Sequence, residues 1–151
     1  MARIITGPAW VDTATQRFVI SWYNRRRIAG LNALSSNFTT SSTTNVEGMP
    51  SNRAEFLCWA DDTSVCIVQT YNFNATFYCL STASFDGTTN SYPLATFGNN
   101  GYPCTIVEEA QLADGYHYGT LLCAVSAGAG TGTWQGATTV SQTNVTIETR
   151  G

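Results

Sequence analysis

The sequence predicts an all-β protein, built either as a two-sheet antiparallel sandwich of the jelly-roll type or as a closed barrel, and three observations support this. Short stretches of alternating apolar and polar residues recur along the chain, a period of two that is typical of half-buried strands. Turn-forming pairs such as Asp86-Gly87 and Asn100-Gly101 separate these stretches. No stretch of eleven or more residues has an apolar stripe at helical spacing. We therefore expect sheets without helices, and of the two architectures we choose the sandwich.

The first part of the chain divides into an arm and the start of one domain. Residues 1–15 form an apolar N-terminal arm, and residues 16–151 make up the single β-sandwich domain. Alternation over residues 17–23 predicts a half-buried strand. Residues 28–46 are rich in Ser, Thr and Asn, which indicates a loop or edge strand with Phe38 as its aromatic anchor.

The middle of the chain predicts a hairpin followed by several short strands. Residues 53–60 and 63–71 flank Asp61-Asp62, a two-residue connection of the kind that closes a β-hairpin. We therefore expect these two strands to pair. Further strands are predicted over residues 76–81, 92–97 and 105–112.

A long central hairpin is predicted over residues 112–136. It opens at Asp114-Gly115 and continues as a strand whose two faces are both mostly uncharged, so we expect this hairpin to be covered on both sides. A glycine-rich reversal over residues 127–132 would return the chain to Trp134. The two faces of the strand hold Tyr116, Tyr118, Thr120, Leu122 and Ala124 on one side, and His117, Gly119, Leu121, Cys123 and Val125 on the other.

The last predicted strand covers residues 139–149. It alternates so that Thr143, Val145 and Ile147 share one face. We expect these three side chains to point into the core.

The composition suggests surface that is shared between molecules. The 151 residues suffice for one domain, and 11% of them are charged, against roughly 25% in ordinary globular proteins. All seven basic residues are arginine, the basic residue that interfaces favour over lysine; a GC-rich genome would give the same bias. The net charge of −3 argues against a nucleic-acid coat, which needs a positive field.

Targeting and redox features are plain. The N-terminus lacks the apolar run of a signal peptide, and no stretch approaches ~20 apolar residues, so we expect a protein made in the cytoplasm and not placed in a membrane. Five cysteines, an odd number, lie in strand-like segments. Buried thiols suit this pattern better than a disulfide framework.

Residues for catalysis or metal binding are sparse. His117 is the single histidine and lies in a predicted strand between two tyrosines, without a nucleophile elbow nearby. Cys58 and Cys66 are too far apart for a Cys-x-x-Cys zinc knuckle. We therefore expect a packed or interface histidine, and no catalytic residue, metal or cofactor.

Aromatic residues are the remaining candidates for ligand binding. Tryptophans within alternating strands are expected in the core. Tyr92 and Tyr102 lie beside Pro93 and Pro103 in predicted loops, so these two tyrosines are the candidates for stacking against a glycan.

Two motifs resemble a known class of proteins. EFLCWADDTSVCI (residues 55–67) and LADGYHYGTLLCAVSAGAGTGTW (residues 112–134) resemble a loose pattern in small bacteriophage virion proteins and tail-fibre tips, and the similarity covers about the last two-thirds of the chain. The resemblance implies a jelly roll and a virion component that forms a homotrimer. It carries no catalytic residue to this chain.

The resemblance allows two functions, and the sequence distinguishes them because it lacks the pattern of a fibre shaft. A tail fibre needs an elongated stalk, whereas the first fifty residues contain no coiled-coil or β-helical pattern. We therefore expect a capsid decoration (cement) protein that binds itself and the major capsid protein. The alternative is a receptor-binding or lectin-like tip that binds host-surface glycan. In the first reading, the residues expected at the capsid or subunit interface are Ile4, Ile5, Trp10, Arg25, Arg26 and Arg27.

Overall fold

The computed structural model describes residues 27–58, 62–88, 93–126, 130–136 and 142–150, and these residues form strands, turns and loops. Within them there is no helix long and apolar enough to span a membrane. The predicted arm (residues 1–15) and the predicted strand over residues 17–23 lie outside the described residues. The strands are β1 (Arg27–Ala33), β2 (Phe38–Thr40), β3 (Val46–Glu47), β4 (Ala54–Cys58), β5 (Thr63–Phe85), β6 (Leu94–Gln111), β7 (Gly115–Val125), β8 (Gly132–Trp134) and β9 (Asn144–Arg150).

The strands form two antiparallel sheets, consistent with the predicted β-sandwich. The first, which we call the β9 sheet, has the order β1, β9, β5 and β6 and uses residues 63–72 of β5 and 102–111 of β6. The second, the β7 sheet, has β7 between residues 79–85 of β5 on one side and β3 and β4 on the other. The finer assignment of jelly-roll connectivity stays a prediction.

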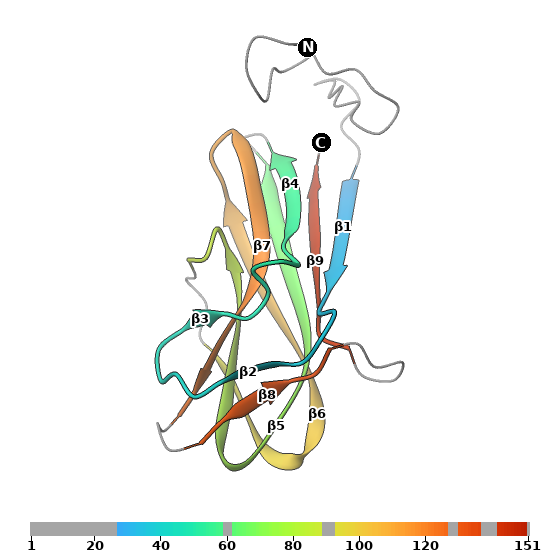
Figure 1. Ribbon diagram of the computed structural model, residues 1–151. Helices are drawn as coiled ribbons and strands as arrows, with labels where there is room; N and C mark the ends of the chain where they lie inside the picture. Colours follow the sequence, from blue (N-terminus) through green and yellow to red (C-terminus); the bar gives the residue numbers. More distant parts are fainter. Residues whose placement is uncertain (1–26, 59–61, 89–92, 127–129, 137–141, 151) are drawn as a thin grey trace.

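β5 and β6 belong to both sheets because they bend together. Their pairing shifts register between Asn72 and Asn74 and again between Asn74 and Cys79, and the two ribbons turn over at the lower end of the molecule (Figure 1). Extra residues in one strand of a pair produce such bends. The predicted strand over residues 76–81 is therefore part of β5, and β6 continues through Asn100-Gly101, where a tight turn was expected.

Two predicted hairpins are wrong. β4 pairs with β7 and not with β5 across Asp61-Asp62, and β8 pairs with β2 and β5 and not with β7. In each case turn-forming residues predict a reversal of the chain, but they do not fix which strand it pairs with next. β7 is nevertheless covered on both faces over residues 119–125, which are all buried, as its uncharged faces predicted.

The core lies between the sheets and follows the predicted alternation. Val145 and Ile147 of β9 are buried, as is Thr143 just before that strand. Across from them, β7 contributes Leu121, Cys123 and Val125. Trp134 is fully buried and packs against Phe38, with ring centroids 6.1 Å apart.

One predicted turn is confirmed, and one close contact is new. Asp86 and Gly87 have φ of 53° and 75°, the left-handed region that turns require. β7 packs tightly against β9 at Gly119, where an added Cβ would lie 2.1 Å from Cδ1 of Ile147. A glycine at this position lets the two sheets approach each other.

Candidate functional site

The structure describes little of the interface predicted from the sequence. Arg27 begins β1, and Tyr102 lies within strand β6 and not in the predicted loop. The structure describes the backbone of these two residues but not their side chains. The others, which are Ile4, Ile5, Trp10, Arg25, Arg26 and Tyr92, also lie outside the described residues. Contact through the arm and glycan stacking by Tyr92 and Tyr102 therefore stay predictions.

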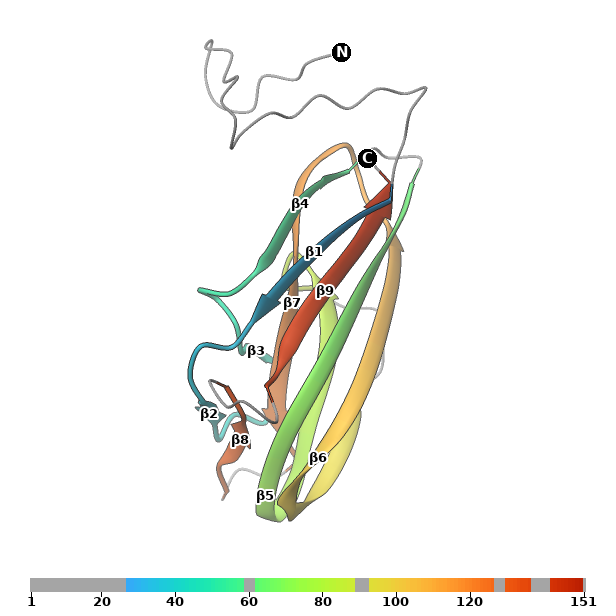
Figure 2. The ribbon, with the colours of Figure 1, turned by 90° about the vertical axis from the view of Figure 1, so that its right-hand side faces the viewer.

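An exposed apolar row crosses the outer face of the β9 sheet, which is the face turned to the viewer in Figure 2. Leu31 of β1 lies opposite Thr146 of β9, Thr146 lies opposite Ile67 of β5, and Ile67 lies opposite Val107 of β6. Directly opposed residues share a face. Leu31 is 70% exposed and Val107 is 49% exposed, while Ile67 is half-buried. We call Leu31, Thr146, Ile67 and Val107 the apolar row.

A row with two carboxylates and a row with amides flank the apolar row. The acidic row is, from β1 to β6, Ala29, Glu148, Val65 and Glu109. The amide row, on the other side, is Ala33, Asn144, Gln69 and Thr105. Within it, Nδ2 of Asn144 donates to Oε1 of Gln69 at 3.2 Å. We call the three rows together the outer face.

This surface has the character of an interaction site. The inner residues of the same strands, such as Cys66, Val68 and Ile147, already fill the core, so the apolar row is not needed to build it. Apolar side chains grouped on a flat exposed face and bordered by polar groups mark contact surfaces more often than single exposed residues do. The outer face is the strongest candidate among the described residues.

A polar and aromatic surface lies on the other sheet. Arg53 makes a two-bond ion pair with Glu47, with Nε–Oε1 at 2.7 Å and Nη2–Oε2 at 2.6 Å, and its guanidinium lies 4.1 Å from the centroid of the Tyr118 ring. The bond from Arg53 lowers the pKa of Glu47. Tyr116 is 52% exposed, and desolvation together with a hydrogen bond to Glu55 raises its pKa. Sequence reasoning placed Tyr116 in a covered strand and missed this exposure.

His117 is a packed histidine. Its Nδ1 lies 2.6 Å from Oδ2 of Asp86, and its Nε2 donates to the carbonyl oxygen of Ala113 at 2.8 Å. The ring also lies 6.0 Å from the Phe56 ring. Both ring nitrogens are occupied, so this side chain ties the turn after β5 to the β6–β7 connection.

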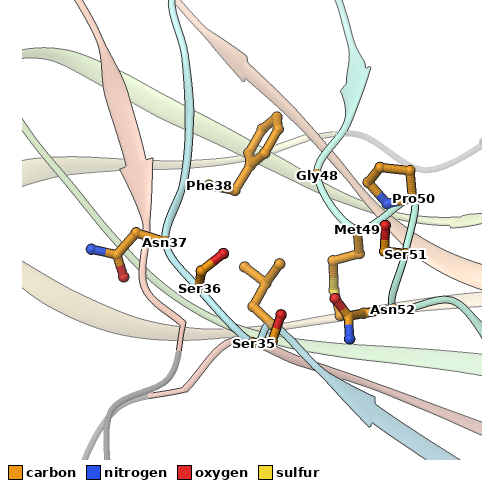
Figure 3. Close-up of a pocket in the computed structure, with 10 residues that line it drawn as sticks. Ser35, Ser36, Asn37, Phe38, Gly48, Met49, Pro50, Ser51 and Asn52 are labelled. Atoms are coloured by element: carbon orange, nitrogen blue, oxygen red, sulfur yellow. The ribbon is translucent and has the colours of Figure 1, made fainter.

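A shallow pocket of about 190 Å³ lies between the β1–β2 and β3–β4 connections (Figure 3). Phe38 and Met49 contribute apolar surface, and serine and asparagine side chains such as Ser36 and Asn52 surround them. One of its polar atoms has a structural role, because Oδ1 of Asn37 accepts a bond from the Gly136 backbone at 2.9 Å. The pocket is small and polar, and the described residues that line it include no charged side chain.

The thiols are structural. Cys58, Cys66, Cys79 and Cys123 are buried, and none of the five cysteines is in a disulfide, as the strand positions predicted. Burial raises the pKa of Cys66 to about 12 and that of Cys123 well above its usual value, so both stay protonated and unreactive at neutral pH. Among the described residues, no group of His, Cys, Asp and Glu side chains could hold a metal ion.

Comparison of the sequence with protein-family models and with curated proteins finds no match. What the protein does is therefore inferred from its own residues.

Proposed function

We propose that this protein is a non-enzymatic structural protein of a virion, a capsid decoration protein that binds the shell as a homotrimer and stabilises it. The observation that carries the proposal is the apolar row, Leu31 to Val107, exposed on a flat sheet face. The resemblance of residues 55–67 and 112–134 to phage virion proteins supports the virion setting.

The exposed row gives such a protein a reason to associate. Each square ångström of apolar surface that is removed from water contributes about 25 cal/mol of favourable free energy. Covering Leu31 and Val107 with another surface would therefore stabilise association. The low charge content of 11% adds to this tendency, because few charges oppose contact between copies. A protein that clamps a shell acts through area buried at junctions, and a flat sheet face suits that role.

The chemical groups that an enzyme would use serve the fold instead. His117 is held by Asp86 and by the backbone of Ala113, and the thiols of Cys66 and Cys123 are buried and protonated. These contacts favour a structural role over a catalytic one.

The test is to measure solution mass and binding to emptied capsids for the wild type and for Leu31→Asn. We expect a trimer that binds shells, and we expect Leu31→Asn to weaken shell binding by about tenfold or more, since it removes apolar area through which copies meet on the shell. Leu94→Asn is the matched control, because Leu94 is an exposed leucine (40%) on the other sheet. A monomer that binds no shell at high concentration would refute the proposal.

A glycan-binding tip is the second candidate, and the Tyr116 surface favours it. An exposed tyrosine beside Glu55, with Arg53 over Tyr118 close by, supplies a flat ring and polar groups that could receive a sugar. A glycan array in which Tyr116→Ala or Tyr102→Ala abolishes a specific signal, with Tyr78→Ala unchanged, would favour this function over decoration.

A further inference from the structure

We infer that the outer face of the β9 sheet packs against the same face of a second copy, about a two-fold axis that runs along the apolar row from Leu31 to Val107. The inference rests on the proposed function, in which copies of the chain meet, and it names the surface and the symmetry of one contact. It starts from the order of the three rows on the outer face.

Two orientations let the apolar row cover itself. A two-fold axis along the row places each of its residues opposite its own equivalent, and it places the acidic row of one copy over the amide row of the other. A two-fold axis parallel to the strands instead places acidic row over acidic row. In both, the sheets face each other about 10 Å apart with strands aligned to within about 30°.

Polarity separates the two orientations. With the axis along the row, Glu109 faces Thr105 of the second copy, whose hydroxyl can donate to the carboxylate. Glu148 faces the polar amide of Asn144 of the second copy, whose Nδ2 already donates to Gln69 and to the backbone of Gln142. With the axis along β5, Glu109 faces Glu148 of the second copy, and with the axis between β5 and β9, Glu148 faces Val65. Burying a carboxylate against another carboxylate or against an aliphatic side chain is unfavourable. The first orientation is therefore the one that the outer face fits.

The contact is of modest size. Four strands spaced about 4.8 Å apart and about nine residues of strand length at about 3.3 Å each give roughly 500 Å² of flat face per copy, or about 1,000 Å² in total. This is the lower limit for a specific interface, so the contact should depend on concentration. A closed trimer joins two different patches on each copy, whereas a two-fold contact joins identical ones. The outer face would thus link copies that belong to neighbouring trimers on a shell, where the local concentration is high.

The test uses cysteine pairs on the central strand β5 in the full-length protein. With the axis along the row, position 65 of one copy faces position 69 of the second. Two copies of position 65 are instead offset by about 13 Å along the strands, four residues at about 3.3 Å each, in addition to the sheet spacing of about 10 Å, and so lie roughly 16 Å apart. We expect a short bis-maleimide cross-linker that spans about 10 Å, the spacing of packed sheets, to join a mixture of Val65→Cys and Gln69→Cys chains into a heterodimer, and to join either variant alone at least about tenfold less.

Three controls accompany the mixture. The wild type reports any linkage through native thiols, a mixture of Thr39→Cys and Gln69→Cys reports random collision, since Thr39 is exposed on β2, and adding Leu31→Asn to both chains should reduce the heterodimer about tenfold or more. Self-linked Val65→Cys chains without the heterodimer, or a heterodimer that Leu31→Asn leaves unchanged, would overturn the inference.

Failure of this inference can be told apart from failure of the proposed function. Capsid binding by a trimer that gives no 65–69 linkage at high concentration would overturn the face-to-face contact and leave decoration standing. A 65–69 linkage in a protein that neither trimerises nor binds capsids would leave the contact standing and refute decoration.

Discussion

Replacing Gly119 by alanine should disturb a tight contact between the two sheets. A Cβ at this position would lie 2.1 Å from Cδ1 and 2.9 Å from Cγ1 of Ile147, and 3.1 Å from Sγ of Cys66. All three atoms belong to buried side chains of the β9 sheet. Ordinary contacts between carbon atoms are about 3.5–4.0 Å, so Ile147 must change its rotamer or the sheets must move apart.

The structure also indicates the size of the effect and a partial rescue. Overpacking of this kind costs about 1–3 kcal/mol, and Ile147→Val alone costs about 0.5–1.5 kcal/mol because it leaves a small cavity. In the double variant, the missing Cδ1 makes room for the new methyl group, while the contacts with Cγ1 and Sγ remain tight. We expect Gly119→Ala with Ile147→Val to be more stable than the sum of the single changes by about 1 kcal/mol.

Urea unfolding followed by circular dichroism measures all four proteins of this cycle. Gly132→Ala is unsuitable as a control because its Cβ would also meet core atoms, whereas Gly30→Ala is suitable, since nothing lies within 4 Å of that position. Gly30→Ala should change the free energy of unfolding by less than about 1 kcal/mol. Strict additivity of Gly119→Ala and Ile147→Val would show that the sheets do not approach through this glycine, and the close packing of β7 on β9 would be wrong.

Two further predictions concern polar contacts. Oγ of Ser81 is buried and accepts from Nε1 of Trp134 at 2.8 Å, so Ser81→Ala should destabilise the protein by about 1–3 kcal/mol by leaving that indole donor unpaired; a urea midpoint unchanged within error would contradict this. Because Arg53 lowers the pKa of Glu47, the ion pair stabilises the fold above the ordinary glutamate pKa of about 4.3 and loses its effect as the pH falls further. Glu47→Gln should therefore be less stable than the wild type at pH 7 and nearly equal to it near pH 2, and an unfolding difference independent of pH would count against the pair.

Alternation predicted which residues face the core because it is a local property. Thr143, Val145 and Ile147 were expected inside and are buried, since successive side chains of any strand point to opposite faces. The same reasoning placed Leu121 and Val125 on one face of β7, and both belong to the core.

Strand pairing could not be predicted in this way because it is not local. Asp61-Asp62 is a plausible hairpin turn, yet β4 lies in the β7 sheet and not beside the first part of β5. At its five paired positions, β4 meets residues of β7 that are 57 to 65 positions further along the chain. β5 pairs with four different strands along its length, and a sequence window cannot show a strand that changes partners where it bends. The exposure of Tyr116 was missed for a similar reason, because it depends on which other elements cover this end of β7 and not on the local sequence.

The outer face was likewise hidden in the sequence, although one local signal pointed to it. Leu31, Ile67, Val107 and Thr146 are far apart in the chain, and only the register of three strand pairs brings them into a row. Residues 65–68 and 106–107, however, are apolar without interruption, so their strands present apolar side chains to both faces. Strands of this kind normally have cover on both sides. The β7 sheet covers the inner side of these strands. On the outer side, about half of the Val107 surface is exposed, and a second copy of the chain would cover it.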